Sequence, residues 1–198
     1  MSHYFENDEH LKSEIRQIKY TIDGITTSLY TDIGVFSKNG IDYGTLVLLK
    51  TIIPYIDAGK VLDIGCGYGA IGLTLAIHNL NIHVQGVDVN ERALSLFNKN
   101  ACALGLSQRV TCLRSDVYEK IEGEFEYIVS NPPIRAGKRV TYRIYDEANS
   151  YLKDGGKLFL VVRKQQGAPS VYTHLKELFK SVEVVNKDKG YWIIIATK

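Results

Sequence analysis

A glycine-rich segment at residues 61–72 (VLDIGCGYGAIG) follows a short apolar run and could hold a small ligand. Gly65, Gly67 and Gly69 predict a tight turn, and glycines let the backbone approach a ligand closely because no Cβ intervenes. Asp63 stands just before the turn, where a carboxylate would repel a pyrophosphate and would suit a ligand carrying a cationic amino group. The segment therefore argues against a dinucleotide site, with a plain strand-to-helix turn as the alternative.

Two further carboxylates follow later apolar runs. Asp88 ends the triplet Gly86-Val87-Asp88, and an acidic residue at such a strand end can accept both hydroxyl groups of a ribose. Asp116 follows Ser115, and its carboxylate could accept the amino group of an adenine. Taken singly, Asp88 is equally well explained as an N-cap or turn residue, and Asp116 is better explained as a solvated loop residue.

Residues 130–134 (SNPPI) carry a fourth candidate group. Two consecutive prolines fix φ and remove two backbone donors, which leaves carbonyl oxygens displayed as acceptors, and Asn131 adds a side-chain acceptor. Two such acceptors can bind the two N–H groups of an amine and orient its nitrogen for attack on an electrophile, which is catalysis by positioning. Elsewhere Asn-Pro-Pro is usually a turn, but at a strand end beside a ligand pocket it is far more specific.

The elements that must position these groups alternate along the chain. Apolar runs predict strands at residues 60–64, 83–88, 110–113, 127–130, 157–162, 182–185 and 192–196, and helices are expected at 70–79, 91–104, 142–152 and 170–179. A turn at 188–190 is too short for a crossover, so the last two strands must be antiparallel. The pattern predicts a Rossmann-like, doubly wound α/β fold with seven strands, mostly parallel, and an antiparallel final strand.

The four motifs fall at the ends of consecutive predicted strands. In an open α/β sheet the ligand crevice lies outside the carboxyl ends of the strands. Four independent turn residues would not be expected to line up there, so Asp63, Asp88, Asp116 and Asn131 are expected to share one site.

The first 45 residues do not show the alternation of strands and helices that the rest of the chain shows. Residues 18–30 (IKYTIDGITTSLY) predict a β-hairpin with Asp23-Gly24 as its turn, followed by a loop at 31–42 and an apolar helix at 45–55. We expect a single domain over residues 1–198. In it, residues 1–45 form the hairpin and a loop facing the site, and residues 46–198 form the core.

Length, composition and charge indicate the size of the core and the kind of partner. The chain has 198 residues, 45% of them hydrophobic, which suffices for one buried core. The formal net charge of +2 is unevenly spread, with 11 basic and 16 acidic residues up to Ser130 and 13 basic and 6 acidic residues after it. A basic C-terminal third points to an anionic partner such as RNA, and solvated surface lysines explain it equally well.

Cysteine, histidine and hydropathy patterns argue against a disulfide-rich, metal-binding, secreted or membrane protein. The three cysteines form no CxxC pair and fit a reducing cytosol, and the five histidines show no metal-ligand spacing, so no metal is expected. The polar N-terminus does not have the features of a signal peptide, and no apolar run approaches the roughly 20 residues that span a bilayer. We therefore expect a cytoplasmic protein without a membrane partner.

The order of DIGCGYGAIG, GVD, SD and NPPI, with the final hairpin, resembles class I methyltransferases that depend on S-adenosylmethionine (SAM). NPP plus one residue is similar to the subset that methylates amino groups: adenine N6, guanine N2 or a glutamine amide. His3-Tyr4-Phe5, the hairpin and residues 34–45 (GVFSKNGIDYGT) resemble the catalytic half of the bacterial small-subunit ribosomal RNA (guanine-N2) methyltransferase C family. The resemblance does not extend to the second, N-terminal methyltransferase-like domain of that family.

The resemblance implies SAM as the cofactor and a role for each motif. The methionine part would be held by the glycine-rich turn, the ribose by the end of the second strand, and the adenine by the loop after the third, with the amide of the NPP motif bordering the cofactor. In that order the implied cofactor-binding residues are Asp63, Gly65, Cys66, Gly67, Asp88, Val89, Asp116, Val117 and Asn131.

The resemblance also implies how the target is held. Asn131, Pro132, Pro133 and Ile134 would be the catalytic residues that grip the amine, with Ile134 where many relatives have a stacking aromatic. The loop with Phe36 and Ser37 would close over cofactor and base. Basic residues just beyond the motif would contact RNA phosphates, namely Arg135, Lys138, Arg139 and Arg143, although helix-surface solvation explains them too.

The implied function is methylation of guanine N2 in ribosomal RNA, with that RNA or the small ribosomal subunit as partner and a monomer or homodimer as the active form. Methylation of adenine N6 or of a protein glutamine amide stays open, and the basic C-terminal third and Ile134 weigh mildly against the amide. A SAM-binding ribosome-assembly factor with little catalysis is the non-enzymatic alternative. A nicotinamide-dependent reductase is disfavoured by Asp63 and by the seven-strand pattern.

Overall fold

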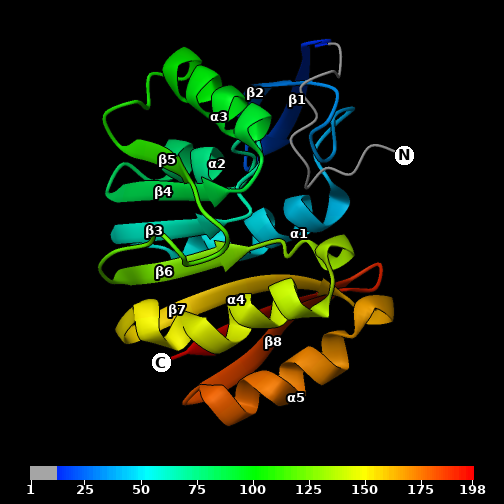
Figure 1. Ribbon diagram of the computed structural model, residues 1–198, viewed down its shortest axis with the longest axis vertical. Coiled ribbons are helices and arrows are strands. Elements are labelled where there is room, and N and C mark those ends of the chain that lie inside the picture. The colour runs from blue at the N-terminus through cyan, green and yellow to red at the C-terminus, as the bar shows by residue number, and fades with distance from the viewer. Residues whose placement is uncertain (1–12) are drawn as a thin grey trace.

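The computed structural model describes residues 13–198 of the chain (Figure 1). His3, Tyr4 and Phe5, which contributed to the family resemblance, lie outside the described residues, as does the side chain of Arg135. Two sheets are present in the described part. One is a two-stranded hairpin near the N-terminus, and the other is a seven-stranded sheet that carries the core.

The strands and helices alternate as the sequence predicts. The strands are β1 (Arg16–Ile22), β2 (Ile25–Thr31), β3 (Gly59–Ile64), β4 (Ile82–Asp88), β5 (Val110–Arg114), β6 (Phe125–Ser130), β7 (Leu152–Arg163), β8 (Ser181–Asp188) and β9 (Tyr191–Thr197). The α-helices are α1 (Tyr43–Ile52), α2 (Gly72–His78), α3 (Glu91–Ala103), α4 (Lys138–Tyr151) and α5 (Ala168–Leu178). Short 3-10 helices are η1 (Ile53–Tyr55), η2 (Ile134–Ala136) and η3 (Lys164–Gln166).

The large sheet has the order β5-β4-β3-β6-β7-β9-β8. Strands β3 to β7 are mutually parallel, and β9 is antiparallel to both of its neighbours, β7 and β8. The order reverses between β3 and β6, so the connections before and after that point run to opposite faces of the sheet. The predicted doubly wound sheet with an antiparallel final strand is confirmed.

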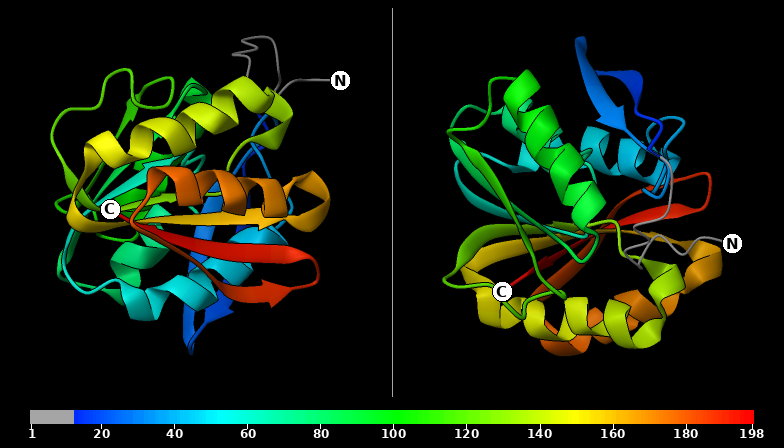
Figure 2. Two further views of the ribbon diagram at one scale, coloured as in Figure 1. Left: turned by 90° about the horizontal axis from the view of Figure 1, so that it is seen from below. Right: turned by 45° about the horizontal axis from the view of Figure 1, so that its top comes forward.

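Helices cover both faces of this sheet. The left view of Figure 2 shows α4 and α5 (yellow and orange) on one face and α1 (cyan) on the other. Successive residues of the central strands alternate between the two cores. Val61 and Val129 pack on the α1 side, whereas Leu62 and Ile128 pack on the α4 side. Burial of both faces explains why these strands read as continuous apolar runs in the sequence.

Several boundaries differ from the predicted ones. Helix α4 begins at Lys138, four residues earlier than expected, and α1 begins at Tyr43 because Asp42 caps its N-terminus. Strand β7 begins at Leu152, not at residue 157, because the pairing with β6 shifts register between Phe125 and Tyr127. Residues 153–156, which lie between the predicted helix and the predicted strand, are thus an irregular part of β7.

The hairpin packs against the core through buried polar contacts. Asn100 of α3 donates from Nδ2 to the carbonyls of Tyr30 (3.0 Å) and Tyr68 (2.9 Å), and its Oδ1 accepts the Tyr30 N–H (2.7 Å). The Tyr20 hydroxyl lies 2.6 Å from Thr74 Oγ1 of α2. These contacts hold the end of β2, and with it the loop that follows, beside the main sheet.

Among the helices of residues 13–198, none has both the length and the apolar character needed to cross a membrane.

Candidate active site

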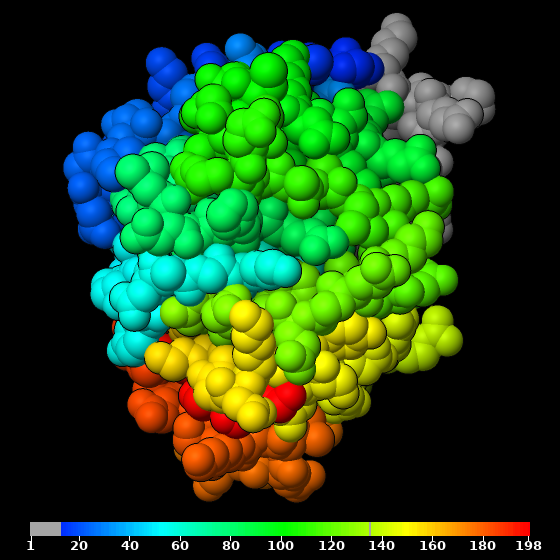
Figure 3. Space-filling view, turned by 90° about the vertical axis from the view of Figure 1, so that its left-hand side faces the viewer, coloured from blue at the N-terminus to red at the C-terminus, as the bar shows by residue number. Residues whose placement is uncertain are grey.

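The four predicted motifs meet at one edge of the sheet. Asp63 is the penultimate residue of β3, Asp88 ends β4, Asp116 lies two residues past β5, and Asn131 directly follows β6. These strands are neighbours in the sheet and point to the right in Figure 1. Figure 3 shows the opposite edge, where the yellow start of β7 and the red C-terminus lie.

The glycine-rich turn leaves open space beside its backbone. Gly65, Gly67 and Gly69 have φ of +72°, +55° and +97°, a region that favours glycine. A Cβ on Gly67 would meet no heavy atom within 4 Å, and one on Gly65 would meet only Pro133 Cδ at 4.0 Å. A ligand can therefore contact this backbone directly, whereas the space beside Gly69 is filled by Leu73.

Cys66 lies inside the same turn but faces the core. Its thiol is buried, and a Cβ on Gly86 would lie 2.9 Å from its sulfur. Burial and the neighbouring carboxylates raise the pKa of the Cys66 thiol well above its ordinary value. A neutral, buried thiol packs the turn against β4 and is a poor nucleophile.

Asp63 is fully buried and has one oxygen without a partner. Its Oδ2 accepts the N–H of Gly72 (2.8 Å) and so holds the start of α2, while no described residue hydrogen-bonds to its Oδ1. Burial raises the pKa of Asp63 to about 7, the Gly72 N–H opposes this shift, and the charge of Asp88 adds to it. An orphaned carboxylate oxygen at this depth is an acceptor suited to a cationic ligand group.

Asp88 uses both carboxylate oxygens to order the turn. Its Oδ2 accepts the N–H of Gly67 (2.9 Å), and its Oδ1 accepts the N–H of Asn90 (2.9 Å). Burial raises the pKa of Asp88, and these hydrogen bonds oppose the rise. Each oxygen keeps lone pairs for a ligand, and Val89 beside it is half-buried.

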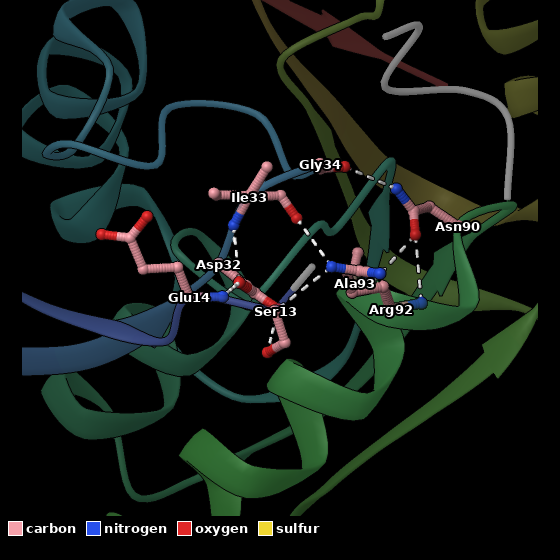
Figure 4. Close-up of polar contacts among 8 residues, drawn as sticks. All are labelled: Ser13, Glu14, Asp32, Ile33, Gly34, Asn90, Arg92 and Ala93. Carbon is pink, nitrogen blue, oxygen red and sulfur yellow. Dashed lines mark hydrogen bonds and ion pairs between the residues drawn. The ribbon is translucent and has the colours of Figure 1, made fainter. Parts of the chain in front are cut away.

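The loop that carries Phe36 and Ser37 is anchored to the start of α3, through Asn90 and Arg92 (Figure 4). Asp32 is buried, accepts hydrogen bonds from Ser13, Glu14 and Ile33, and lies 3.3 Å from Arg92 Nη1. A second contact with this end of α3 comes from its N-cap residue Asn90, whose Nδ2 donates to the Gly34 carbonyl (3.0 Å). Beyond this anchor, Phe36 is 54% exposed and Ser37 has φ +57°.

The loop after β5 combines a strained backbone with an ion pair. Val117 is buried with φ +55°, a conformation that is costly for a β-branched residue and clusters at ligand sites. Asp116 pairs with Arg143 (2.9 Å), which also contacts Glu147 (3.1 Å). Arg143, one of the basic residues expected to meet phosphates, is therefore already engaged by two carboxylates.

Asn131 is held by the start of α1. Its Nδ2 donates to Asp42 Oδ2 (3.1 Å) and to Thr45 Oγ1 (2.9 Å). Asp42 is also the N-cap of α1 and accepts the Thr45 N–H (3.1 Å). Because both hydrogens of the amide have acceptors in α1, the side-chain oxygen Oδ1 is the group that remains to accept a hydrogen bond.

The two prolines form a tight turn. The Pro132 carbonyl accepts the Ile134 N–H (2.8 Å), and the Pro133 carbonyl accepts the Ala136 N–H (2.8 Å). The sequence predicted carbonyls displayed as acceptors, and the structure shows that each already receives one hydrogen bond. A carbonyl oxygen has a second lone pair, so each can accept one more. Ile134 is half-buried here, and Lys138 and Arg139 are exposed at the start of α4.

The methyltransferase small domain family matches residues 26–195, which is most of the chain. This chain belongs to the methyltransferase small domain family. The match begins within β2 and includes the loop, all four motifs and most of the final hairpin, so β2 and the loop are part of the family domain, whereas β1 lies outside the matched residues.

Similar relatives of this methyltransferase differ in length. Uncharacterized protein YbxB of Bacillus subtilis is 39% identical over 198 residues, which cover 99% of this chain and 98% of that protein. Ribosomal RNA small subunit methyltransferase C of Salmonella paratyphi B is 34% identical over 171 residues. That alignment covers 84% of this chain and 48% of the relative, so the chain matches about half of the longer protein.

Solved structures share the fold. The 16S rRNA N2 methyltransferase RsmC of T. thermophilus, solved with AdoMet and guanosine, has a TM-score of 0.83 and 29% identity. The match covers 95% of this chain and 52% of that one. A methyltransferase from Pyrococcus furiosus has a TM-score of 0.65 and 24% identity, covers 77% of this chain and 80% of that one, and supports the fold alone.

Some site residues of this methyltransferase were not found by sequence reasoning. Asp42 and Thr45 hold the Asn131 amide, and Asp32 and Arg92 anchor the loop. The spacing of Asp42 and Thr45 is an N-cap signal, but nothing local indicates that the same pair contacts Asn131. In residues 13–198, no cluster of three or more His, Cys, Asp or Glu side chains could hold a metal ion.

Proposed function

We propose that this methyltransferase transfers the methyl group of SAM to the exocyclic N2 of a guanine in small-subunit ribosomal RNA. The observation that carries the proposal is the Asn131 amide, whose nitrogen is held by Asp42 and Thr45 so that its oxygen can accept from an amine. Two relatives support ribosomal RNA of the small subunit, the methyltransferase C of Salmonella paratyphi B and RsmC of T. thermophilus, and the second, an N2 methyltransferase solved with guanosine, supports guanine.

The residues of the glycine-rich side fit SAM. The open space beside Gly65 and Gly67 admits a ligand, and the orphaned Asp63 Oδ1 suits the amino group of the methionine part. Cys66 packs behind this turn. When bound, SAM supplies an electrophilic methyl group on a positively charged sulfur.

The next two strand ends would hold the rest of the cofactor. The remaining lone pairs of Asp88 would accept the ribose hydroxyls, with Val89 alongside. Asp116 and Val117 would flank the adenine, and the strained backbone of Val117 is consistent with a ligand site.

The target amine would be held by two acceptors. Asn131 Oδ1 would accept one N–H, and the second lone pair of the Pro132 carbonyl would accept the other. The lone pair of guanine N2 is delocalised into the ring, and two hydrogen bonds would favour the pyramidal form that attacks along one line. The base would have to be unpaired or flipped out of its helix to reach this position.

Other residues would enclose the base and its strand. Pro133 and Ile134 would offer an aliphatic face to the ring, and the loop with Phe36 and Ser37 would close from the other side. Basic residues just past the motif would contact phosphates, namely Arg135 and the exposed Lys138 and Arg139.

The test is methyl transfer from labelled SAM to substrates from a strain that lacks this protein. Total RNA, small ribosomal subunits and cell protein are offered separately, and the label is identified after digestion. Recovery of N2-methylguanosine from RNA or subunits is expected. Label in N6-methyladenosine would assign adenine N6 as the target in place of guanine N2. Label only in protein would assign a glutamine amide. Tight SAM binding with no label anywhere would favour the ribosome-assembly factor.

A further inference from the structure

Two exposed cations lie over two tyrosine rings at one corner of the molecule. Lys189 Nζ lies 4.6 Å from the centroid of the Tyr43 ring, and Arg163 Cζ lies 5.5 Å from that of Tyr191. The two rings contact each other, with centroids 5.9 Å apart. We refer to Tyr43, Arg163, Lys189 and Tyr191 as the cationic–aromatic cluster.

The cluster is held in place by contacts among four elements, α1, β7, β8 and β9. Tyr43 opens α1 and donates its hydroxyl to Asp188 Oδ2 at the end of β8 (2.7 Å). Arg163 and Tyr191 are opposite each other in the β7–β9 ladder. Gly44 makes room for the Tyr191 ring, since a Cβ there would lie 2.7 Å from Tyr191 Cε1. The rings therefore support two cations in a fixed place, which lowers the entropy lost when they bind an anion.

The cluster adjoins the residues that hold the Asn131 side-chain amide. Asp42, which accepts from Asn131, immediately precedes Tyr43 in the chain. The β8–β9 turn lies at the carboxyl edge of the sheet, on the same side of Figure 1 as the start of α4. A strand that presents a base to Asn131 would therefore have its flanking backbone within reach of this corner.

We propose that Arg163 and Lys189 bind phosphates of the RNA strand that flanks the target nucleotide, an inference that rests on the proposed function. Two carboxylates lie near this corner and both accept hydrogen bonds: Asp188 from the Tyr43 hydroxyl, and Asp42 from Asn131 Nδ2 and the Thr45 N–H. Residues 131–198, which include Arg163 and Lys189, have 13 basic and 6 acidic residues, and this positive net charge favours binding to an RNA backbone. Each cation held on a ring is a positional contact to phosphate and carries no base specificity.

The experiment measures binding of a fluorescent, single-stranded RNA containing guanine, between about 50 and about 200 mM salt. Arg163→Ala and Lys189→Ala are each expected to weaken RNA binding several-fold. Each should also reduce the salt slope by about 1, and the double variant by about 2. The KM for RNA should rise while kcat and SAM affinity stay unchanged. Arg163→Lys keeps the charge and should retain most of the affinity, which separates loss of a phosphate contact from misfolding.

Lys157→Ala is the matched control, because Lys157 Nζ also lies over a tyrosine ring, 5.9 Å from that of Tyr55, but six residues before Arg163 on β7 and away from the site. Wild-type affinity and slope in the double variant would overturn the inference, as would an equal loss in the control. Failure of the proposed function is read separately, from the absence of N2-methylguanosine in the wild-type product. If the wild type methylates protein and does not bind RNA, both proposals fail together.

Discussion

The two halves of the site are ordered by different kinds of contact. In the half formed by the ends of β3 and β4, the carboxylates of Asp63 and Asp88 accept backbone N–H groups that are 9, 21 and 2 residues away. In the half formed by β6 and α1, side chains hold Asn131 from 89 and 86 residues away. The first half is built within one strand–turn–helix unit and its neighbour, whereas the second exists only once α1 has packed on the sheet.

This difference means that the halves should respond separately to mutation. Changes at Asn131 or its α1 partners should alter transfer and leave cofactor affinity alone. Changes at Asp63 or Gly67 should alter stability and cofactor affinity, because those residues also shape the start of α2. The following variants test that separation, in order of the expected effect.

Asn131→Ala should have the largest effect. Under the proposed function, loss of the amide oxygen would remove a hydrogen bond that orients the target amine, so the rate of transfer should fall by about a hundredfold to a thousandfold. The dissociation constant for SAM, measured by calorimetry, should stay the same. Transfer at the wild-type rate would show that Asn131 does not hold the amine, and a parallel loss of SAM binding would show that the halves are coupled.

Asp63→Asn should remove a pH dependence of stability. Burial raises the pKa of Asp63 from 3.8 to about 7, so between those values the folded protein keeps a proton that the unfolded chain has lost. The free energy of unfolding contributed by this group therefore falls as pH rises through that window, and lower pH stabilises. The change in the wild type between about pH 5 and about pH 8 should be on the order of 2 kcal/mol.

The asparagine variant still has an oxygen to accept the Gly72 N–H and does not titrate. Urea unfolding of both proteins at several pH values gives the comparison. An identical pH dependence in the two would show that Asp63 is ionised throughout the range.

Gly67→Ala and Gly24→Ala form a matched pair. Both positions have positive φ, +55° and +79°, and neither Cβ would meet a heavy atom within 4 Å. Each variant should lose about 1 kcal/mol of stability from backbone strain. Only the Gly67 variant should weaken SAM binding, by about tenfold or about 1.4 kcal/mol, since its methyl group enters the ligand space. Equal SAM affinity in the two variants would mean that the open space beside Gly67 is not used.

Thr45→Val should have the smallest effect. It removes one of the two acceptors of Asn131 Nδ2 while keeping the shape of the side chain, at a cost of about 1 kcal/mol in positioning. The turnover number should fall by about three- to fivefold, with no change in SAM affinity. Thr51→Val, in the same helix but bonded to Val47 and Asn186, is the control and should leave transfer unchanged.

The sequence by itself determined the order of the elements and the residues at the strand ends. Alternating apolar and amphipathic runs predict βαβ units, and such units bring the carboxyl ends of parallel strands to one edge. Turn chemistry was also readable, since Asp23-Gly24 and Lys189-Gly190 both adopt the positive φ angles that two-residue hairpins need. The Asn90 cap of α3 is likewise a local feature, since its side chain accepts the N–H groups of Arg92 and Ala93.

Only the tertiary structure decided how the side chains at that edge are paired. The partners of Asn131, the engagement of Arg143 by Asp116, and the contact of Tyr43 with Asp188 across 145 residues depend on how helices pack on the sheet. Local propensity acts over a few residues, whereas these contacts form between elements whose distance in the chain carries no signal in one sequence. The motif residues were therefore predictable, and the arrangement that orients the Asn131 oxygen was not.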